Sequence, residues 1–354
     1  MRFRILDASL EKERSEWAAR WSEWSARDVM AHPEYARLFA RPGDRVVCAA
    51  AEGGGAMVLF PLLLRPLAAE SWAREGERRW DAATPYGYGG PFAFGALPHD
   101  EEGFWEAYAE WCRAERVVTT FARLSLFPEQ LLSFPAGVET RAENVIVSLE
   151  GGAEAVWRRY EPKVRRWVRT AQAAGLAVEV DREGERLDDF VRIYTHTMQR
   201  HHAEAWYFFP RSFFEAIRDR LRGHFAFFHT LAGGRVVSSD LVLCSAEHVY
   251  YFLGGTLEDA FALGPNYLLK HAVMRWAAEE GKRRVVLGGG YEPNDGLLRY
   301  KRGFARRGVV PFRIACLVHD EEGCRGLAED RAAAAARAGA PWVPRPRFFP
   351  PYRA

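Results

Sequence analysis

The stretch from residue 285 to residue 304 (VVLGGGYEPNDGLLRYKRGF) constrains the fold more than any other part of the chain. Its first three residues predict a short buried strand, and Gly288, Gly289 and Gly290 follow that strand at once. Residues without a Cβ at a strand end indicate that another element or a ligand approaches the backbone closely. A turn over 293–296 then leads into an aromatic and basic segment, 297–304. We therefore expect a close contact at the strand end, with a ring and a cation beside it.

Lysine usage singles out one cation in this stretch. The chain has 49 basic residues, and its only lysines are Lys12, Lys163, Lys270, Lys282 and Lys301. A chain that otherwise uses arginine has a compact ammonium at Lys301, next to Tyr300. A solvated lysine and a core tyrosine are the alternative readings.

Length and composition bound the class of protein. A chain of 354 residues exceeds what one hydrophobic core usually organises, so two domains are expected. A net charge of +2 provides no whole-molecule field for binding nucleic acid, and any polyanion, DNA or RNA, would have to meet a local basic patch. No apolar run reaches the length of a membrane span, and the charged N-terminus is unlike a signal peptide, so we expect a cytoplasmic protein. The five widely spaced cysteines indicate reduced thiols.

Apolar periodicity and turn residues predict alternating strands and helices. Helices are expected at 11–25, 104–114, 187–200 and 266–280, with another after Glu154 that restarts at Pro162. Strands are expected at 46–51, 57–64, 117–126, 145–149, 178–180, 225–231, 235–244, 248–254, 285–287 and 312–318. The glycine-rich segment TPYGYGGP (84–91) is expected to be irregular, and its tyrosines Tyr86 and Tyr88 could line a pocket or cap the sheet. The pattern restarts near Ala142, which suggests two similar modules.

The helix after Pro162 is basic on every side that is not apolar. Its cations are Lys163, Arg165, Arg166 and Arg169, and within the helix after Pro162 they have no acidic partners four residues away. Such a cluster suits phosphates or carboxylates, which arginine forks can grip with two hydrogen bonds each. A plain solvated face is the alternative.

Histidines and aromatic residues gather at 201–210 (HHAEAWYFFP). His196 and His202 fall on different helix faces and no His-x-x-x-His pair occurs, so we expect no metal here. His201, Trp206 and Tyr207 could form a pocket wall that contacts an acceptor, or could simply pack.

Four stretches together resemble the Fem family, the aminoacyltransferases that build peptidoglycan cross-bridges, and the wider FemAB-like branch of the GNAT acyltransferases. Tyr300, Lys301, Gly303 and Phe304 stand where that family has its C-terminal motif. Residues 84–91, 160–175 and 263–281 match family stretches in the same order, so the resemblance covers most of the chain. Tyrosine at 300, where the family more usually has phenylalanine, is a departure.

The resemblance implies an α+β fold of tandem GNAT-like domains, each with a mixed, mostly antiparallel sheet flanked by helices. We place an N-terminal domain at 1–142, a C-terminal FemAB-like domain at 143–330, and an alanine-rich helix with a proline-rich tail at 331–354. In the GNAT core neighbouring strands splay and the acyl donor enters between them.

The implied activity is N-acyl transfer, which needs donors aimed at a negative oxygen and a positioned amine, but no enzyme nucleophile. Lys301 and Tyr300 are the catalytic candidates, and Asp240, Glu292 and Asp295 are guesses for proton removal. Candidate acceptor-binding residues are Tyr160, Lys163, Arg165, Arg166, Arg169, His201, Trp206, Tyr207, Tyr86 and Tyr88. Candidate donor-binding residues are Gly264, Asn266, Gly288, Gly289, Gly290 and Tyr291.

The donor distinguishes the alternatives. GGTLEDAFALGPN (254–266) lacks the arginine or glutamine and the paired glycines that hold CoA pyrophosphate, and its two acidic residues would repel phosphate. We therefore expect an aminoacyl-tRNA donor, whose acceptor end would be a partner, and a nucleotide-linked muropeptide or other amine as acceptor. The sequence also allows contact with a lipid-linked precursor. Two alternative functions remain: acyl transfer from CoA to an amino sugar or small amine, and a non-catalytic module that holds a peptide or nucleotide-sugar.

Overall fold

The computed structural model describes residues 1–96, 99–292 and 295–354. They form two compact units. Unit 1 comprises residues 1–24, 30–141 and 312–354, and unit 2 comprises residues 25–29 and 142–311. The start of unit 2 agrees with the expected boundary near residue 142.

The expected C-terminal boundary was wrong. Residues 312–330 belong to unit 1, because strand β13 (Val309–Val318) pairs there with strand β6 (Val117–Arg123). The tail is not a separate region either, since Tyr352 is fully buried and its hydroxyl lies 2.8 Å from the Thr119 hydroxyl. Unit 1 is therefore built from both ends of the chain.

Unit 1 has a mixed, mostly antiparallel sheet in the order β1-β2-β3-β4-β6-β13, with β5 also pairing β3. Its other strands are β1 (Arg2–Asp7), β2 (Arg45–Gly53), β3 (Ala56–Pro66), β4 (Trp80–Ala83) and β5 (Phe92–Gly95). Its helices are α1 (Glu11–Glu23), α2 (Pro33–Arg37), α3 (Glu101–Ala114) and α10 (Glu321–Arg337). Among the described strands of unit 1, β4 and β6 pair in parallel, and β5 and α3 lie between them along the chain.

Unit 2 repeats this plan with the sheet order β7-β12-β11-β10-β9-β8. Its strands are β7 (Val138–Ser148), β8 (Ala177–Asp181), β9 (Phe225–Ala232), β10 (Arg235–Cys244), β11 (His248–Thr256) and β12 (Arg284–Gly289). Its helices are α4 (Gly152–Arg159), α5 (Pro162–Ala173), α6 (Leu187–Arg200), α7 (Arg211–Arg220), α8 (Pro265–Glu279) and α9 (Gly296–Arg302). The expected α+β class, with mixed and mostly antiparallel sheets, is confirmed.

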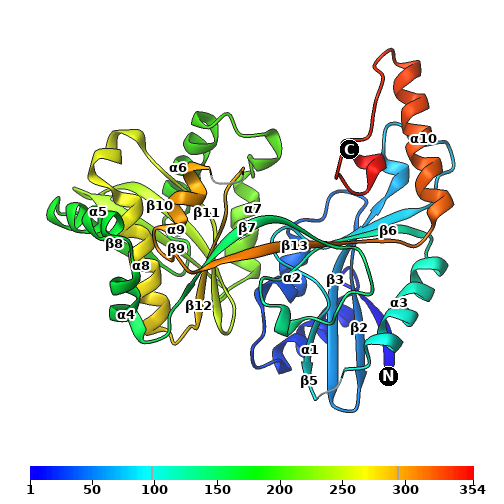
Figure 1. The fold of residues 1–354 in the computed structure, drawn as a ribbon, viewed down its shortest axis with the longest axis horizontal. Helices are drawn as coiled ribbons and strands as arrows, with labels where there is room; N and C mark the ends of the chain where they lie inside the picture. Colours follow the sequence, from blue (N-terminus) through cyan, green and yellow to red (C-terminus); the bar gives the residue numbers. More distant parts are fainter. Residues whose placement is uncertain (97–98, 293–294) are drawn as a thin grey trace. The chain divides into compact units, whose positions relative to one another are not determined.

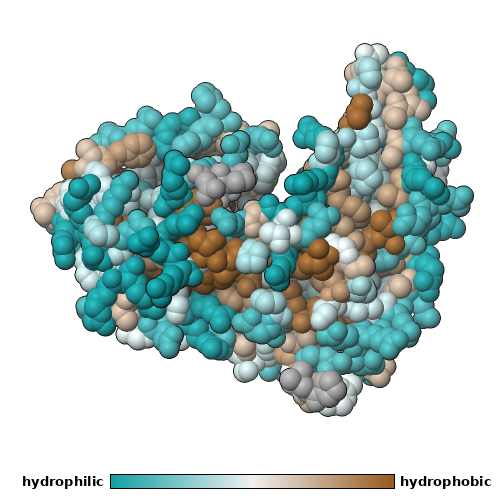
Figure 2. Space-filling model, in the orientation of Figure 1, coloured by the Kyte–Doolittle hydropathy of each residue, from teal (hydrophilic) through white to brown (hydrophobic). Residues whose placement is uncertain are grey.

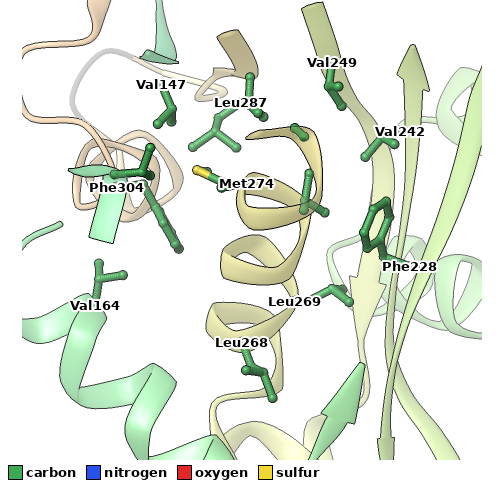
Figure 3. Packing of buried hydrophobic residues seen from close by; sticks show 14 of the residues in the cluster. Val147, Val164, Phe228, Val242, Val249, Leu268, Leu269, Met274, Leu287 and Phe304 are labelled. Atoms are coloured by element: carbon green, nitrogen blue, oxygen red, sulfur yellow. The ribbon is translucent and has the colours of Figure 1, made fainter. Parts of the chain in front are cut away.

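The two faces of the unit 2 sheet are covered by different helices. Helix α8 packs against β9 and β10, with α4 and α5 beside it, whereas α6 packs against β10 and β11 (Figure 1). Figure 3 shows the α8 side, where Phe228 and Val242 of the sheet face the helix that carries Leu269 and Met274. Because side chains alternate along a strand, each residue of β10 points to one helix layer or the other.

The parallel strands β11 and β12 pair over a short distance only. Their register runs from His248 opposite Arg284 to Tyr250 opposite Val286, although β11 continues to Thr256 and β12 to Gly289. On its other side β12 pairs with β7 along its whole length, with a bulge between Val286 and Gly288, so beyond Val286 it pairs with β7 alone. This is the parting of neighbouring strands that the GNAT core implies.

Several elements differ from the expectation. Helix α7 was not predicted, and neither was α9, which forms part of the segment after the predicted turn. Helix α10 begins at Glu321 rather than after Asp330, and a 3₁₀ turn occupies Glu258–Leu263 within the expected loop. Two residues of the predicted turn, Pro293 and Asn294, lie outside the described residues. Among the described residues, no helix is both long and apolar enough to cross a bilayer.

Candidate active site

Helix α9 places Lys301 beside the end of strand β12. Asp295 is the N-cap of this helix, and its carboxylate accepts the backbone N–H groups of Leu298 and Tyr291, each at 2.6 Å. At the other end of α9, Gly303 lies so close to α5 that a Cβ would sit 2.9 Å from Val164, and Phe304 enters the core. The motif therefore ties α9 to the sheet at one end and to α5 at the other.

Lys301 is buried, with 5% of its surface exposed. Its Nζ donates a hydrogen bond to the Gly289 carbonyl at 2.5 Å. Burial, with a smaller effect of the nearby Lys270 ammonium, lowers the pKa of Lys301 to about 7, against the opposing attraction of Asp295 and Asp240. The solvated alternative for Lys301 is excluded.

A second buried lysine lies next to Lys301. Lys270 of α8 forms an ion pair with Asp240 of β10, and both side chains are buried. The Tyr251 ring of β11 contacts both cations, with its centroid 3.7 Å from Lys270 Nζ and 5.7 Å from Lys301 Nζ. Two lysine side-chain nitrogens, one carboxyl group and one phenol ring therefore meet where β11 parts from β12. We call Lys270, Asp240, Tyr251 and Lys301 the lysine cluster.

Tyr300 is packed rather than available for stacking. Its ring meets Tyr267 edge-on with centroids 5.0 Å apart and Phe304 at 5.4 Å, and its hydroxyl donates to the Asn266 carbonyl at 3.1 Å. Burial raises the pKa of Tyr300 far above its usual value, so the hydroxyl stays neutral. Tyr300 was predicted to be either a catalytic residue or a core residue, and in this structure its side chain packs with the core.

The glycines expected to receive a donor are explained by the chain itself. A Cβ on Gly289 would lie 2.6 Å from the Glu143 carbonyl, and one on Gly290 would lie 2.3 Å from the Asp295 carboxylate. Gly288 has a positive φ of 77° at the bulge of β12. Gly264, with φ of 67°, caps α8 and would place a Cβ 2.8 Å from the Trp167 ring. Close approach of other elements, rather than space for a ligand, accounts for these positions.

The basic residues expected on the helix after Pro162 separate into two groups. Lys163 and Arg166 are exposed on α5 and form no ion pair within the described ranges, and the Arg169 guanidinium lies 5.5 Å from the centroid of the Trp157 ring. Arg165 instead donates to the carbonyls of Arg158 and Tyr160, which end helix α4. Hydrophilic residues cover much of the visible face over α4 and α5 (Figure 2).

Tyr160 is a core residue. It is buried among Trp157, His271 and Phe304, and burial raises the pKa of its hydroxyl. Its expected contact with an acceptor is therefore wrong for the side chain as it lies in this structure.

The aromatic residues of 201–210 remain on the surface. Trp206 is 47% exposed and stacks on Tyr207 at 3.5 Å, and Tyr207 meets Tyr291 edge-on at 6.5 Å. His201 is exposed, and its Nε2 lies 3.2 Å from Arg200 Nη2. Burial and the neighbouring Arg200 charge lower the pKa of His201. Tyr207 and Tyr291 thus connect the predicted acceptor and donor residues on one surface.

Tyr86 and Tyr88 lie in unit 1 and pack against other aromatic rings. Tyr86 meets Phe39 at 5.9 Å, and its backbone carbonyl accepts the Tyr35 hydroxyl at 2.6 Å. Tyr88 meets Phe312 edge-on at 5.7 Å. A cavity of about 690 Å³ in unit 1 is lined by other residues, among them Arg78, Arg113 and His319, and none of the predicted site residues lines it.

Sequence reasoning missed most of the lysine cluster. Lys270 was noticed only as a rare lysine, Asp240 only as a guess for the base, and Tyr251 not at all. A signal existed for two of them, because Asp240 interrupts an apolar strand and Lys270 follows Leu268 and Leu269 on the inward face of a helix. A charge in either place must be paired or functional.

Comparisons with known proteins agree with this architecture. Residues 157–302 match a family model described as an acetyltransferase (GNAT) domain. The crystal structure of FemX superposes with a TM-score of 0.64 at 14% identity, covering 85% of this chain and 95% of FemX. The C-terminal domain of a putative lysylphosphatidylglycerol synthetase from Agrobacterium fabrum gives a TM-score of 0.54 at 16% identity, covering 92% and 96% of the two chains. L-PGS from Bacillus licheniformis gives 0.54 at 12% identity, covering 85% and 90%.

No curated protein sequence matches the chain. The family match over residues 157–302, with strands that part beside a buried lysine, shows that the chain contains an acyltransferase domain of the GNAT type. The fold of the chain is similar to that of FemX. The expected resemblance is thereby confirmed.

Proposed function

We propose that the protein transfers an aminoacyl group from an aminoacyl-tRNA to an amine of a peptidoglycan precursor stem peptide. The observation that carries the proposal is the buried Lys301 amine at the point where β11 and β12 part. Attack of an amine on an ester passes through a tetrahedral intermediate with a negative oxygen. A Lys301 ammonium that forms as the intermediate appears, in a site with little water, would stabilise that oxygen, or a donor phosphate, far more than it could in solution.

The N-terminus of α8 supports a donor other than CoA. A pyrophosphate needs free backbone N–H groups at a helix start. Here Trp167 lies against Gly264, Tyr300 bonds to the Asn266 carbonyl, and the exposed acidic residues Glu258 and Asp259 precede the helix. Trp167 thus crowds the helix start, and the two carboxylates before it pair with Arg200 and Arg235, so these cations are not free for a phosphate.

The acceptor side of the proposal uses the exposed cations of α5. Lys163, Arg166 and Arg169 would hold the phosphates of a nucleotide-linked muropeptide, and the surface rings of Trp206, Tyr207 and Tyr291 would contact its peptide or the acceptor end of the tRNA. The fold shared with FemX supports this substrate class.

Transfer assays would test the donor and the acceptor together. The purified protein would be given UDP-linked pentapeptide with either labelled aminoacyl-tRNA or labelled acetyl-CoA. We expect product with the tRNA donor. Product with acetyl-CoA alone would overturn the donor assignment. Phosphatidylglycerol is the acceptor to substitute if the peptide remains unlabelled, because the Agrobacterium relative is a putative lysylphosphatidylglycerol synthetase.

Lys301→Met should lower turnover by a factor of about 100, as loss of one electrostatic donor typically does, while the acceptor Michaelis constant changes little. Steady-state kinetics measure both. Lys12→Met, which removes an exposed lysine of α1, is the matched control and should keep wild-type rates. An unchanged rate in Lys301→Met would refute the role of Lys301.

Acetyl or acyl transfer from CoA to an amino sugar or small amine is the second candidate, and the match to an acetyltransferase domain favours it. Binding of CoA to the intact protein would raise its melting temperature. A melting temperature that rises with CoA, together with no transfer from aminoacyl-tRNA, would support this candidate. Binding of peptide or nucleotide-sugar without turnover by any donor would support a non-catalytic module.

A further inference from the structure

The ion pair between Lys270 and Asp240 has no part in the function described so far. Both side chains are buried, Lys270 with 5% and Asp240 with 3% of the surface exposed. A buried ion pair loses about as much in desolvation as it gains in attraction, and well-packed apolar residues often stabilise a fold equally well. Stability alone is therefore a weak reason for this pair beside Lys301.

The pair leaves Lys301 without a counter-ion. The charged groups facing Lys301 are Lys270 from α8, Asp240 from β10 and Asp295 from the start of α9, and β11 contributes the Tyr251 ring. Asp240 is taken by Lys270, and Asp295 accepts backbone N–H groups with both oxygens. Among the described residues, Lys301 forms no ion pair and bonds only to the Gly289 carbonyl.

We propose, building on the function above, that the Asp240–Lys270 pair positions Lys301 as a proton carrier between the attacking amine and the leaving oxygen. By holding Asp240, Lys270 denies Lys301 a carboxylate that would otherwise pair with it and favour its ammonium form. A buried amine without a paired anion favours its neutral form and is then able to accept a proton. Lys270 and Asp240 are positioning residues, and Lys301 is the group that contacts the reacting atoms.

The proton and electron balance of the step closes without another reactant. The acceptor nitrogen uses its lone pair to form the C–N bond at the ester carbonyl, and Lys301 Nζ takes the proton that this nitrogen must lose. The C–O bond to the tRNA ribose then breaks, and the ribose oxygen leaves with the bonding pair. That oxygen receives the proton from Lys301, which returns to its neutral form.

The rate should therefore depend on the protonation of Lys301. Wild-type kcat/KM should rise with pH and level off above about 7, following the depressed pKa of Lys301. Lys270→Met removes a neighbouring positive charge and releases Asp240, and both changes raise the pKa of Lys301. We expect the rising limb to move to higher pH by at least about one unit, so that activity drops at least about fivefold at pH 7 and recovers near pH 9.

Lys270→Arg keeps the positive charge, so the rising limb of its pH–rate profile should stay close to that of the wild type. This variant therefore distinguishes an effect on the pKa of Lys301 from an effect on folding. If Lys270→Met instead lost the same fraction of its rate at every pH, a merely structural role would explain it and the proposal would be overturned. Short reactions with a blank lacking enzyme correct for ester hydrolysis at high pH.

NMR of protein labelled with ¹³C at the lysine Cε tests the same idea without any donor, because five lysines give five signals. Lys301→Arg assigns the Lys301 signal, and exposed Lys12 is the internal reference. We expect a titration midpoint near 7 for Lys301 that rises in Lys270→Met. A midpoint near 10 in the wild type would overturn the inference. If the midpoints are as expected but the protein transfers nothing from aminoacyl-tRNA, the proposed donor is rejected. The effect of Lys270 and Asp240 on the pKa of Lys301 then still stands.

Discussion

At the scale of single residues, Gly289 contributes both to the packing of strand β12 and to the position of the Lys301 amine. Its carbonyl accepts the Lys301 hydrogen bond, and its Cα faces the Glu143 carbonyl of β7 so closely that no side chain fits. The absence of a Cβ therefore fixes where strand β12 ends, and with it the position of the lysine amine.

Gly289→Ala should lower both stability and activity. A Cβ placed 2.6 Å from a backbone oxygen must separate β12 from β7, which costs about 1–3 kcal/mol and displaces the Lys301 partner. Urea unfolding and turnover measure the two effects. Gly296→Ala is the control, since its Cβ would meet open space in the first turn of α9 and should slightly stabilise the helix. Equal stability of the two variants would contradict this account.

The sequence indicates Lys301 because lysine is rare in this chain, and it indicates the glycines because three occur together. It does not show that Lys270 and Asp240 meet. They are 30 residues apart along the chain and come together only when α8 lies across β10. The same limit applies to two tyrosines: Tyr160 was wrongly predicted to contact an acceptor, and the role of Tyr300 was not decided. The sequence does not show whether a tyrosine lies in a core or in a pocket, because that depends on its neighbours in the fold.

At the scale of elements, helix α5 combines a structural arginine with exposed ones. Arg165→Ala should destabilise the protein by about 1–2 kcal/mol, because it removes the hydrogen bonds that hold the carbonyl end of α4. Arg166→Ala should leave stability unchanged and raise the acceptor Michaelis constant several-fold. Thermal unfolding with acceptor titrations separates the two variants. A selective loss of donor affinity in Arg166→Ala would contradict the acceptor role.

Strands were easier to predict than short helices. Every expected strand of unit 2 is present, since each is an apolar run bounded by glycine or polar turns. Helix α7 was missed because it follows an aromatic run that resembles a pocket wall, and α9 because a segment of seven residues has too few turns for its period to show. Helix α7 is stabilised mainly by the burial of Phe213, Phe214 and Ile217, which depends on tertiary packing and not on the local sequence.

At the scale of the whole molecule, buried histidines predict how stability depends on pH. Burial, with smaller effects of nearby arginines, lowers the pKa of His248 to about 3 and that of His271 and His319 to about 4. The unfolded chain binds these protons more readily, so stability is fully present above about pH 6.5 and declines as pH falls towards 4. Each histidine should contribute a loss of about 1–2 kcal/mol between pH 7 and 5.

Urea unfolding at pH 7 and pH 5 measures this loss. His271→Phe keeps an aromatic ring against Trp157 and should recover one histidine's share of the stability at pH 5. His196→Gln, on the exposed side of α6, should behave as wild type. A pH response unaltered by His271→Phe would show that His271 does not stay neutral in the fold.

The return of the chain to unit 1 through β13 has a consequence for biosynthesis. A ribosome completes residues 142–311 before it has made the strand that pairs with β6, and residues 25–29 are already available by then. The catalytic half can thus reach its native state first, while the preceding half waits for the last segment to be translated. Premature termination after residue 311 would spare the lysines and yet leave an unfinished sheet exposed to proteolysis.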